Sequence, residues 1–391
     1  MTYLSHALAL SLSTALLASC SGPVAGDDRA QSTPAASAPA DGEPFAIAEM
    51  GNFNEPWAAA FAPGTPVLFV TEKAGAIEAM DTNTGRMITV SGTPQVDYGG
   101  QGGLGDIAFL ETESNATLDR RTIYLSWAEA GSGDTRGAVL GRGQLVCEEA
   151  DACAIEDLDV IWRQSPKVTG RGHYSHRIAF SPDGQYIFLA SGDRQKQDPA
   201  QDTTNNLGTV LRLNLDGSPA AGNPLASEGG VSRELWSWGH RNILGMEFDS
   251  EGRLWVAEHG PAGGDELNLV QRATNYGWPV VSNGDNYNGT PIPDNDTRPE
   301  FEKPVVGWTP VIAPGSMTFV DGDMFSPWRG DLLIAGLKTK AIIRVEMDGD
   351  EATEVARYDM GTRLREIVEG PDGAIWVLED GENGRLFKLT R

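Results

Sequence analysis

Cationic side chains are scarce in this sequence. Its 391 residues include 30 Lys and Arg against 55 Asp and Glu, so the formal net charge at pH 7 is -25. Because like charges repel, this balance argues against nucleic acid or an anionic membrane surface as a partner. The hydrophobic content of 40% is sufficient for a full core, in one large domain or two ordinary ones. A cluster of cations in so acidic a chain is therefore informative.

Cysteine is also rare. The chain has three cysteines, and it contains neither a CxxC motif nor a Cys/His spacing typical of zinc sites. The first ends the phrase LASC at Cys20, which resembles the bacterial lipobox, where the cysteine becomes lipidated. Cys147 and Cys153 then remain as a pair. In an oxidising periplasm they could close a small disulfide loop; the alternative is two unpaired thiols on a surface loop.

The N-terminal residues indicate export. Residues 1–19 include an apolar stretch too short to span a bilayer, typical of a secretory signal peptide, although no Lys or Arg precedes it. Residues 20–44 are mostly small and polar and predict a disordered tether. We expect the globular domain over residues 45–391, on the periplasmic side of a bacterial envelope membrane. It would be lipid-anchored at Cys20 or released into the periplasm.

Helical periodicity is almost absent, and no GxGxxG motif lies between a strand and a helix, which disfavours a Rossmann fold. A repeated phrase takes their place: an apolar run, a turn with Asp or Pro and Gly, a second apolar run, and a glycine-containing loop. Its copies begin at Phe61, Thr117, Phe180, Phe248, Phe325 and Glu369. Six repeats predict an all-β fold, a six-bladed β-propeller; a pair of β-sandwiches is the rival architecture.

Histidine is the first candidate residue type for chemistry. Beyond the N-terminal segment the chain has His173, His176, His240 and His259, each expected in a loop rather than in a repeat strand. Glycines surround them and let the backbone approach a ligand closely. A further glycine-rich phrase, GGQGGLGD, presents Gln101. Such loops are more often plain turns, so only their combination points to a site.

Cations recur in the remaining loop phrases. SWGHRN supplies Arg241 and Asn242, GLKTK supplies Lys338, and GTRLREI supplies Arg363 and Arg365 at a spacing that places both on one side of a strand. Together they suggest an anionic ligand with several carboxylates or phosphates. Taken singly, each could be a solvated surface residue.

The phrase HGPAGGDELN, followed by NYGWP, indicates a possible calcium site. Asp265 and Glu266 offer carboxylates, and the Gly-Pro turn can direct backbone carbonyls at Ca²⁺, which prefers oxygen ligands. The acidic pair could equally cap a helix or lie as surface charge.

These phrases, in this order, resemble the pyrroloquinoline quinone (PQQ) dependent sugar dehydrogenases, more closely the periplasmic aldose sugar dehydrogenases than the soluble glucose enzyme. The likeness runs from about Glu49 to Leu389 and rests on GQGGLGDIAF, HYSHRIAFSPDG, GDR, ELWSWGHRN, AEHGPAGGDELNLV, NYGWP, IAPGSM, GLKTKAIIRV and RLREIVEGPDG. The resemblance implies a six-bladed propeller that oxidises an aldose at its anomeric carbon to the lactone. Hydride would pass to the quinone, and a respiratory acceptor, the quinone pool or a cytochrome, would reoxidise it.

The resemblance also implies a role for each candidate residue. His173 matches the general base, and Arg241 would stabilise negative charge on the quinone together with calcium. The positions that match quinone contacts are Gln101, Arg241, Asn242, Lys338, Arg363 and Arg365. The carbonyls of Gly260 and Pro261 match ligands of a calcium ion beside the quinone, and Asp265, Glu266 and Tyr276 match a second, structural calcium site.

Departures from the family pattern fall on the substrate side. Where the family has an acidic residue before the base, this chain has Gly172. The family phrase APSG is replaced by one ending in Gly315 and Ser316, and Trp308 lies one place from the position of the aromatic residue that covers the sugar. His176 has no counterpart role and is expected to be structural. Two other functions stay open: a calcium-dependent propeller lactonase, and an anchored binding propeller without catalysis.

Overall fold

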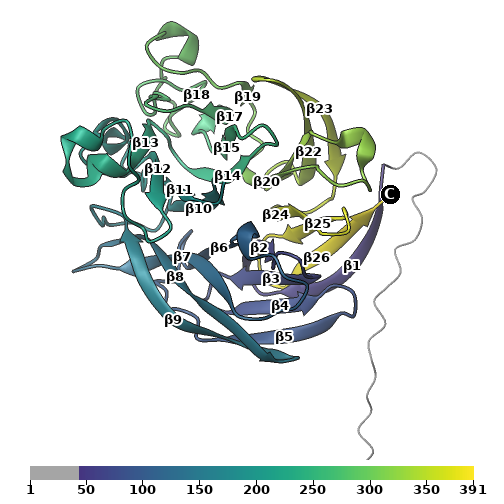
Figure 1. Ribbon diagram of the computed structural model, residues 1–391. Helices are drawn as coiled ribbons and strands as arrows, with labels where there is room; N and C mark the ends of the chain where they lie inside the picture. Colours follow the sequence, from purple (N-terminus) through teal and green to yellow (C-terminus); the bar gives the residue numbers. More distant parts are fainter. Residues whose placement is uncertain (1–43) are drawn as a thin grey trace, which may run out of the picture. The chain divides into compact units, whose positions relative to one another are not determined.

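The computed structural model describes residues 44–391, and the expected signal peptide, lipobox and most of the tether lie outside these residues. The described chain is built of β-strands, with 3₁₀ turns between some of them (Figure 1). None of its helical segments is long or apolar enough to cross a membrane. The 3₁₀ segments are η1 (Glu111–Glu113), η2 (Asp198–Gln201), η3 (Ala226–Glu228), η4 (Gly230–Glu234), η5 (Asn295–Thr297) and η6 (Ser326–Trp328).

The repeated phrases that begin at Phe61, Phe180, Phe248 and Glu369 each span the turn of a β-hairpin. In the copy at Phe180, β10 (Ser175–Phe180) pairs antiparallel with β11 (Tyr186–Ser191). The connecting turn needs Gly184, whose φ is 67°, and the Asp183 carboxylate accepts the Gln185 N–H at 3.1 Å. The local turn chemistry read from the sequence therefore produces the first two strands of a sheet.

Most sheets contain four strands. One is β10, β11, β12 (Thr209–Asn214) and β13 (Leu235–Trp238); the next is β14 (Ile243–Phe248), β15 (Leu254–Glu258), β17 (Asp265–Val270) and β19 (Val306–Trp308). A third is β20 (Pro314–Phe319), β21 (Leu332–Gly336), β22 (Ala341–Asp348) and β23 (Glu351–Asp359). A small ladder joins β16 (Ala262–Gly263) to β18 (Gly284–Asp285).

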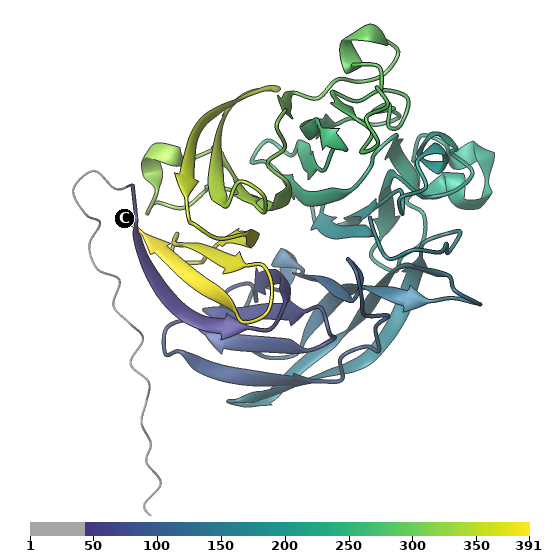
Figure 2. The same ribbon diagram turned by 180° about the vertical axis from the view of Figure 1, so that it is seen from behind.

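The two ends of the described chain share one sheet. Its strands are β24 (Leu364–Glu369), β25 (Ile375–Glu379), β26 (Gly384–Thr390) and β1 (Ala46–Phe53). Ala46 lies opposite Thr390, so the first strand completes the sheet that the last three begin, as the adjacent purple and yellow strands show from both sides (Figures 1 and 2).

The largest sheet has eight strands, in the order β2 (Pro56–Phe61), β3 (Val67–Glu72), β4 (Ile77–Asp81), β5 (Arg86–Ser91), β9 (Ala152–Arg163), β8 (Arg136–Glu149), β7 (Arg121–Ala130) and β6 (Leu104–Phe109). Its two halves meet where β5 pairs parallel with β9, with Val90 opposite Cys153. Cys153 also forms a disulfide with Cys147 across the β8–β9 turn, so the thiols are paired. The disulfide therefore fixes the turn that brings β9 onto β5.

The apolar core lies between neighbouring sheets. One cluster joins β10–β12 to the β7–β8 hairpin through side chains such as Leu140 and Leu189, and another joins β20–β22 to β24–β26 through Leu333 and Val377. The first strands β2, β6, β10, β14, β20 and β24 contact one another in succession, and β24 contacts β2. This arrangement confirms the all-β fold.

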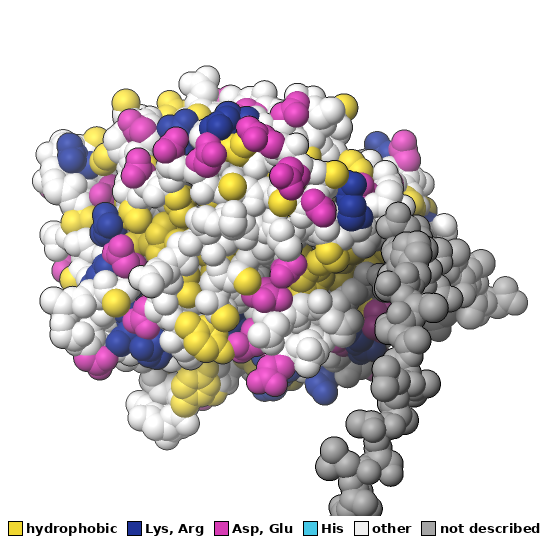
Figure 3. Space-filling view, turned by 90° about the horizontal axis from the view of Figure 1, so that it is seen from below, with side chains coloured by type: hydrophobic (Ala, Val, Ile, Leu, Met, Phe, Trp, Pro, Cys, Tyr) yellow, Lys and Arg dark blue, Asp and Glu magenta, His cyan; other side chains and the backbone are white. Residues whose placement is uncertain are grey.

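The outer surface is mixed in charge. Figure 3 shows acidic and basic side chains interspersed on the face seen from below, with apolar side chains between them. The ring of first strands, by contrast, gathers polar groups at its centre, where the candidate site lies.

Candidate functional site

One arginine, Arg177, lies at the centre of the ring of first strands. Arg177 of β10 is 5% exposed, and its guanidinium contacts all five other first strands. Its partners are the Trp57 ring of β2 (4.2 Å), the Asp106 carboxylate of β6 (3.2 Å), the Leu244 carbonyl of β14 (2.6 Å), the Gly315 carbonyl of β20 (3.2 Å) and the Glu366 carboxylate of β24 (2.8 Å). This network forms a rigid floor between the two ends of the ring.

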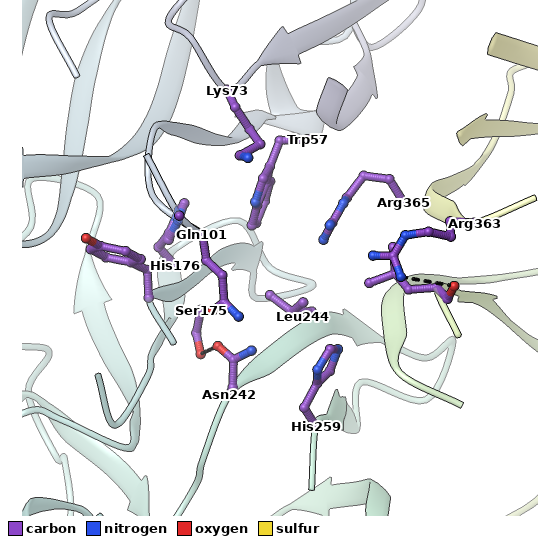
Figure 4. Close-up of a pocket in the computed structure, with 13 residues that line it drawn as sticks. Trp57, Lys73, Gln101, Ser175, His176, Asn242, Leu244, His259, Arg363 and Arg365 are labelled. Carbon is purple, nitrogen blue, oxygen red and sulfur yellow. Dashed lines mark hydrogen bonds between the residues drawn. The ribbon is translucent and has the colours of Figure 1, made fainter. Parts of the chain in front are cut away.

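A cavity of ≈ 180 Å³ lies on one side of this floor (Figure 4). Four of the predicted quinone-contacting residues line it: Gln101, Asn242, Arg363 and Arg365. Figure 4 shows the two arginines on one side and Gln101 on the other. Both arginines pair with Asp380, at 2.7 Å and 2.6 Å. Although burial raises the pKa of Asp380, Arg365 and Arg363 hold it below its ordinary value, so two cations share one carboxylate.

Lys338 does not line this cavity. Its side chain is exposed, while the preceding residue, Leu337, is buried and forms part of the wall. Lys73, which the sequence analysis did not select, lines the cavity in its place. The only sequence signal for Lys73 is its position at the end of the first repeat.

His173 lines a second cavity, of ≈ 140 Å³, together with Arg241 and Pro261. Its backbone N–H donates to the Gln101 Oε1 at 2.6 Å, so the two cavities share a wall. The His173 Nδ1 lies 2.6 Å from the Asp193 carboxylate, whose other oxygen accepts the Trp278 Nε1–H at 2.8 Å. An ionised carboxylate only accepts hydrogen bonds, so it holds the proton on Nδ1 and leaves Nε2 as a base.

The electrostatics of this pair favour a neutral imidazole beside a carboxylate. Burial lowers the pKa of His173, and the hydrogen bond to Asp193 opposes part of that shift. Burial raises the pKa of Asp193, but the contacts with His173 and Trp278 outweigh it and leave the pKa low. The sequence analysis missed Asp193, whose only signal was the conspicuous phrase GDR.

Arg241 lines the His173 cavity and a small space beside Glu258 and Glu266. It is 5% exposed, its Nη1 donates to the His259 carbonyl at 3.0 Å, and its Nη2 donates to the Tyr287 hydroxyl at 3.3 Å. Its Nε is buried without a hydrogen-bond partner, and no carboxylate of residues 44–391 forms an ion pair with its guanidinium. A buried cation without a counter-ion is costly, so this position suits an anionic ligand.

His176 lies within β10, which corrects the expectation that it would occupy a loop. It is 1% exposed, stacks on Trp57 at 4.8 Å between ring centroids, and contacts the Ser126 hydroxyl through Nδ1 at 2.8 Å. Burial lowers its pKa to about 3. A neutral, packed imidazole of this kind has a structural part in the cavity wall.

The predicted calcium ligands fall into two groups. Gly260, Glu266 and Tyr276 line a small space next to Arg241, whereas Pro261 faces the His173 cavity. Asp265 is turned away from Glu266, as neighbours on a strand are, and accepts the Gly260 N–H at 2.8 Å. Burial raises its pKa to about 6. Since both acids lie in β17, they do not cap a helix.

The carboxylate of Glu258 lies beside that of Glu266 in this space. The Asn268 amide donates to Glu258 and to Glu266, each at 3.0 Å, and burial together with Glu258 raises the pKa of Glu266 to about 8. The Tyr276 hydroxyl is engaged elsewhere, donating to the Leu269 carbonyl at 2.6 Å. Within residues 44–391 no group of three or more His, Cys, Asp or Glu side chains could hold a metal. Backbone oxygens would have to complete a cation site.

Trp308 does not cover either cavity. It is 4% exposed in β19 and donates its indole N–H to Glu354 at 2.7 Å, so it belongs to the core between sheets.

This chain is similar to known proteins along most of its length. Residues 53–388 match the family described as Glucose / Sorbosone dehydrogenase. The aldose sugar dehydrogenase YliI of Escherichia coli is 35% identical over 342 residues, covering 86% of this chain and 90% of that protein. The quinoprotein glucose dehydrogenase B of Acinetobacter calcoaceticus is 26% identical, with 85% and 84% covered.

A solved structure extends the likeness to the fold. The apo form of the soluble aldose sugar dehydrogenase from Escherichia coli superposes with a TM-score of 0.82 at 34% identity, covering 88% of this chain and 99% of that chain. The chain therefore belongs to the glucose/sorbosone dehydrogenase family.

Proposed function

We propose that this protein oxidises an aldose at its anomeric carbon to the lactone, with PQQ and calcium as cofactors. The observation that carries the proposal is the His173–Asp193 pair, a base with a free Nε2, beside a cavity whose buried cation Arg241 lacks a counter-ion. One of the relatives is named a quinoprotein, which supports this reading of the cation set.

The residues present fit an acidic quinone. Arg241 has a buried, unpartnered Nε, and Arg363 and Arg365 share one carboxylate, so the lining carries uncompensated positive charge. Gln101 and Asn242 add amide groups to the cavity that Arg363 and Arg365 line. PQQ, when bound, supplies the hydride acceptor. The protein residues bind and orient it, and the cations favour negative charge on its oxygens.

His173 would remove the proton from the anomeric hydroxyl. Asp193 keeps the Nδ1 proton in place and stabilises the imidazolium as it forms, which is the ordinary second partner of a histidine base. The backbone of His173 is held by Gln101, so the base has a fixed position relative to the cavity beyond.

Calcium also fits the residues present. Two carboxylates, Glu258 and Glu266, share one amide donor, and such a pair must take up a proton or a cation. Glu266 and Glu258 would provide carboxylates for the structural site, and Tyr276 would join them only if its hydroxyl left the Leu269 carbonyl. The carbonyls of Gly260 and Pro261 would hold the calcium ion beside the quinone. Asp265 would contribute indirectly, because it accepts the Gly260 N–H and so holds the Gly260 backbone in position.

The proposal includes six blades and a periplasmic location. The eight-stranded sheet divides at the β5–β9 seam into two antiparallel halves, which with four four-stranded sheets makes six units around the ring of first strands. The lipid anchor at Cys20 and a respiratory electron acceptor remain part of the proposal, tested by fractionation and by oxygen uptake with membranes.

Binding and turnover of His173→Ala test this function. We expect the variant to bind PQQ, measured by calorimetry and by the near-ultraviolet band of the cofactor, while turnover falls by about 10² to 10⁴. Unchanged turnover would remove His173 from the mechanism. Absence of PQQ binding by the wild type would instead favour a calcium-dependent lactonase or a binding propeller.

A further inference from the structure

Two loops form the outer wall of the His173 cavity. One carries Gln195 and Gln197, directly after Asp193, and the other carries Asn286 and Tyr287. They meet where the Gln197 amide donates to the Asn286 side-chain oxygen at 3.4 Å. None of the roles derived so far uses these side chains, although they surround the base.

Gln195 occupies space that a glycine leaves free. A Cβ atom at Gly172 would lie 2.4 Å from Cδ of Gln195 and 2.5 Å from its Oε1. The absence of a side chain immediately before His173 therefore allows the Gln195 amide to lie against the backbone next to the base. The Gln195 backbone N–H also donates to Asp193 at 2.8 Å, which ties it to the same pair.

The loop holding Gln195 has a costly backbone conformation. Arg194, Gln195 and Gln197 have φ angles of 55°, 59° and 63°, in the left-handed region that residues other than glycine rarely adopt. Arg194 fixes the loop by donating to the carbonyls of Gly172 and Gly170 at 2.9 Å and 2.7 Å. Strain maintained in this way is typical of a segment that presents side chains to a ligand.

Tyr287 presents a large aromatic ring at the cavity edge. It is 77% exposed, and its hydroxyl accepts a hydrogen bond at 3.3 Å from Arg241, which lines the His173 cavity with it. The Asn286 N–H donates to the Thr290 carbonyl at 3.0 Å and closes the turn that carries it. An exposed ring beside amide groups has the chemistry of a carbohydrate site, since a pyranose has an apolar face and a rim of hydroxyls.

We propose that Gln195 and Tyr287 select the sugar: the pyranose ring lies against Tyr287, and the Gln195 amide hydrogen-bonds a hydroxyl near the anomeric carbon. The inference rests on the proposed function, because it assumes that the substrate of His173 is an aldose. Gly172 contributes by leaving room for Gln195. The site would accept neutral aldoses, since its polar lining from these loops is uncharged.

The Gln195 part is tested with Gln195→Ala and Gly172→Ala in the PQQ- and calcium-loaded protein. Gly172 is outside the left-handed region, so alanine is tolerated by the backbone and acts by displacing Gln195. Losing one neutral hydrogen bond should raise KM for the preferred aldose about three- to tenfold, with a smaller change in kcat. Both variants should also discriminate less than the wild type against one monodeoxy aldose. Gln185→Ala, an exposed position in the β10–β11 turn, is the matched control.

The Tyr287 part is tested with Tyr287→Ala and Tyr287→Phe. Alanine removes the ring and should raise KM about tenfold, whereas phenylalanine keeps the ring and should retain most of the affinity. Binding is measured apart from oxidation by tryptophan fluorescence during titration with a methyl glycoside, which has no free anomeric hydroxyl. Trp278 lines the same cavity and provides the signal.

The outcomes separate the two proposals. If the wild type oxidises aldoses and the Gln195 and Tyr287 variants show wild-type KM, discrimination and glycoside binding, the selection proposal is wrong while the function stands. If the wild type neither binds PQQ nor oxidises aldoses, the proposed function fails first.

Discussion

Replacing Asp193 by asparagine tests the geometry of the base with little change in shape. The Asp193 carboxylate accepts from His173 at 2.6 Å, whereas an asparagine amide could donate to Nδ1 and move the proton to Nε2. The Nε2 atom of His173 would then carry the proton and could not act as the base. We expect kcat with an aldose to fall by about 10² to 10⁴, the range for loss of a general base, while PQQ affinity stays within about twofold.

The pH profile of Asp193→Asn gives an independent readout. Burial lowers the pKa of His173 and Asp193 raises it, so removing the carboxylate should lower that pKa further. Activity requires the neutral base and rises with pH through this pKa. The acid limb of kcat/KM should therefore move to lower pH in whatever activity remains. Trp278→Phe is the control, since it removes the indole donor to Asp193 and keeps the His173–Asp193 contact and an aromatic ring at position 278. Wild-type kcat in Asp193→Asn would refute the assignment of His173 and Asp193.

Three further predictions concern stability. Replacing Cys147 and Cys153 by alanine should lower the free energy of unfolding by about 2 kcal/mol, as expected for a short closed loop, and an unchanged denaturation midpoint would show that the β8–β9 turn is held by its strands alone. Arg177→Met leaves two buried carboxylates unpaired and should cost about 3 to 5 kcal/mol in chemical denaturation; a loss below about 1 kcal/mol would mean that the centre of the ring is not fixed by this side chain. Ca²⁺ should raise the Tm of the wild type, measured by calorimetry, but not the Tm of Glu266→Gln. An equal rise in both proteins would show that Glu266 is not a calcium ligand.

Local patterns explain how much of the fold could be predicted. The turn at Gly184 and its equivalents depend on residues adjacent in sequence, so the hairpins followed directly from the repeats. The parallel seam between β5 and β9 joins residues about sixty positions apart and has no local signal. The pairing of β1 with β26 likewise joins the two ends of the described chain and has no local signal, because it depends on which sheet lacks a fourth strand.

The site shows the same division. Arg363 and Arg365 were expected on one side of a strand, and both reach the cavity because alternation is a local property. Lys338 and Lys73 could not be ranked from sequence, since cavity lining is decided by how loops from different sheets meet. Asp193 was missed because its partner, His173, lies twenty positions earlier and contacts it only after β10 and β11 pair.

Dye-linked oxidation of an aldose panel by the purified apoprotein, with and without PQQ and Ca²⁺, tests the central claim most directly. The account predicts activity only when both cofactors are added, and loss of that activity on chelation. Oxidation without PQQ would contradict it, and so would the absence of oxidation when PQQ and Ca²⁺ are both shown to be bound.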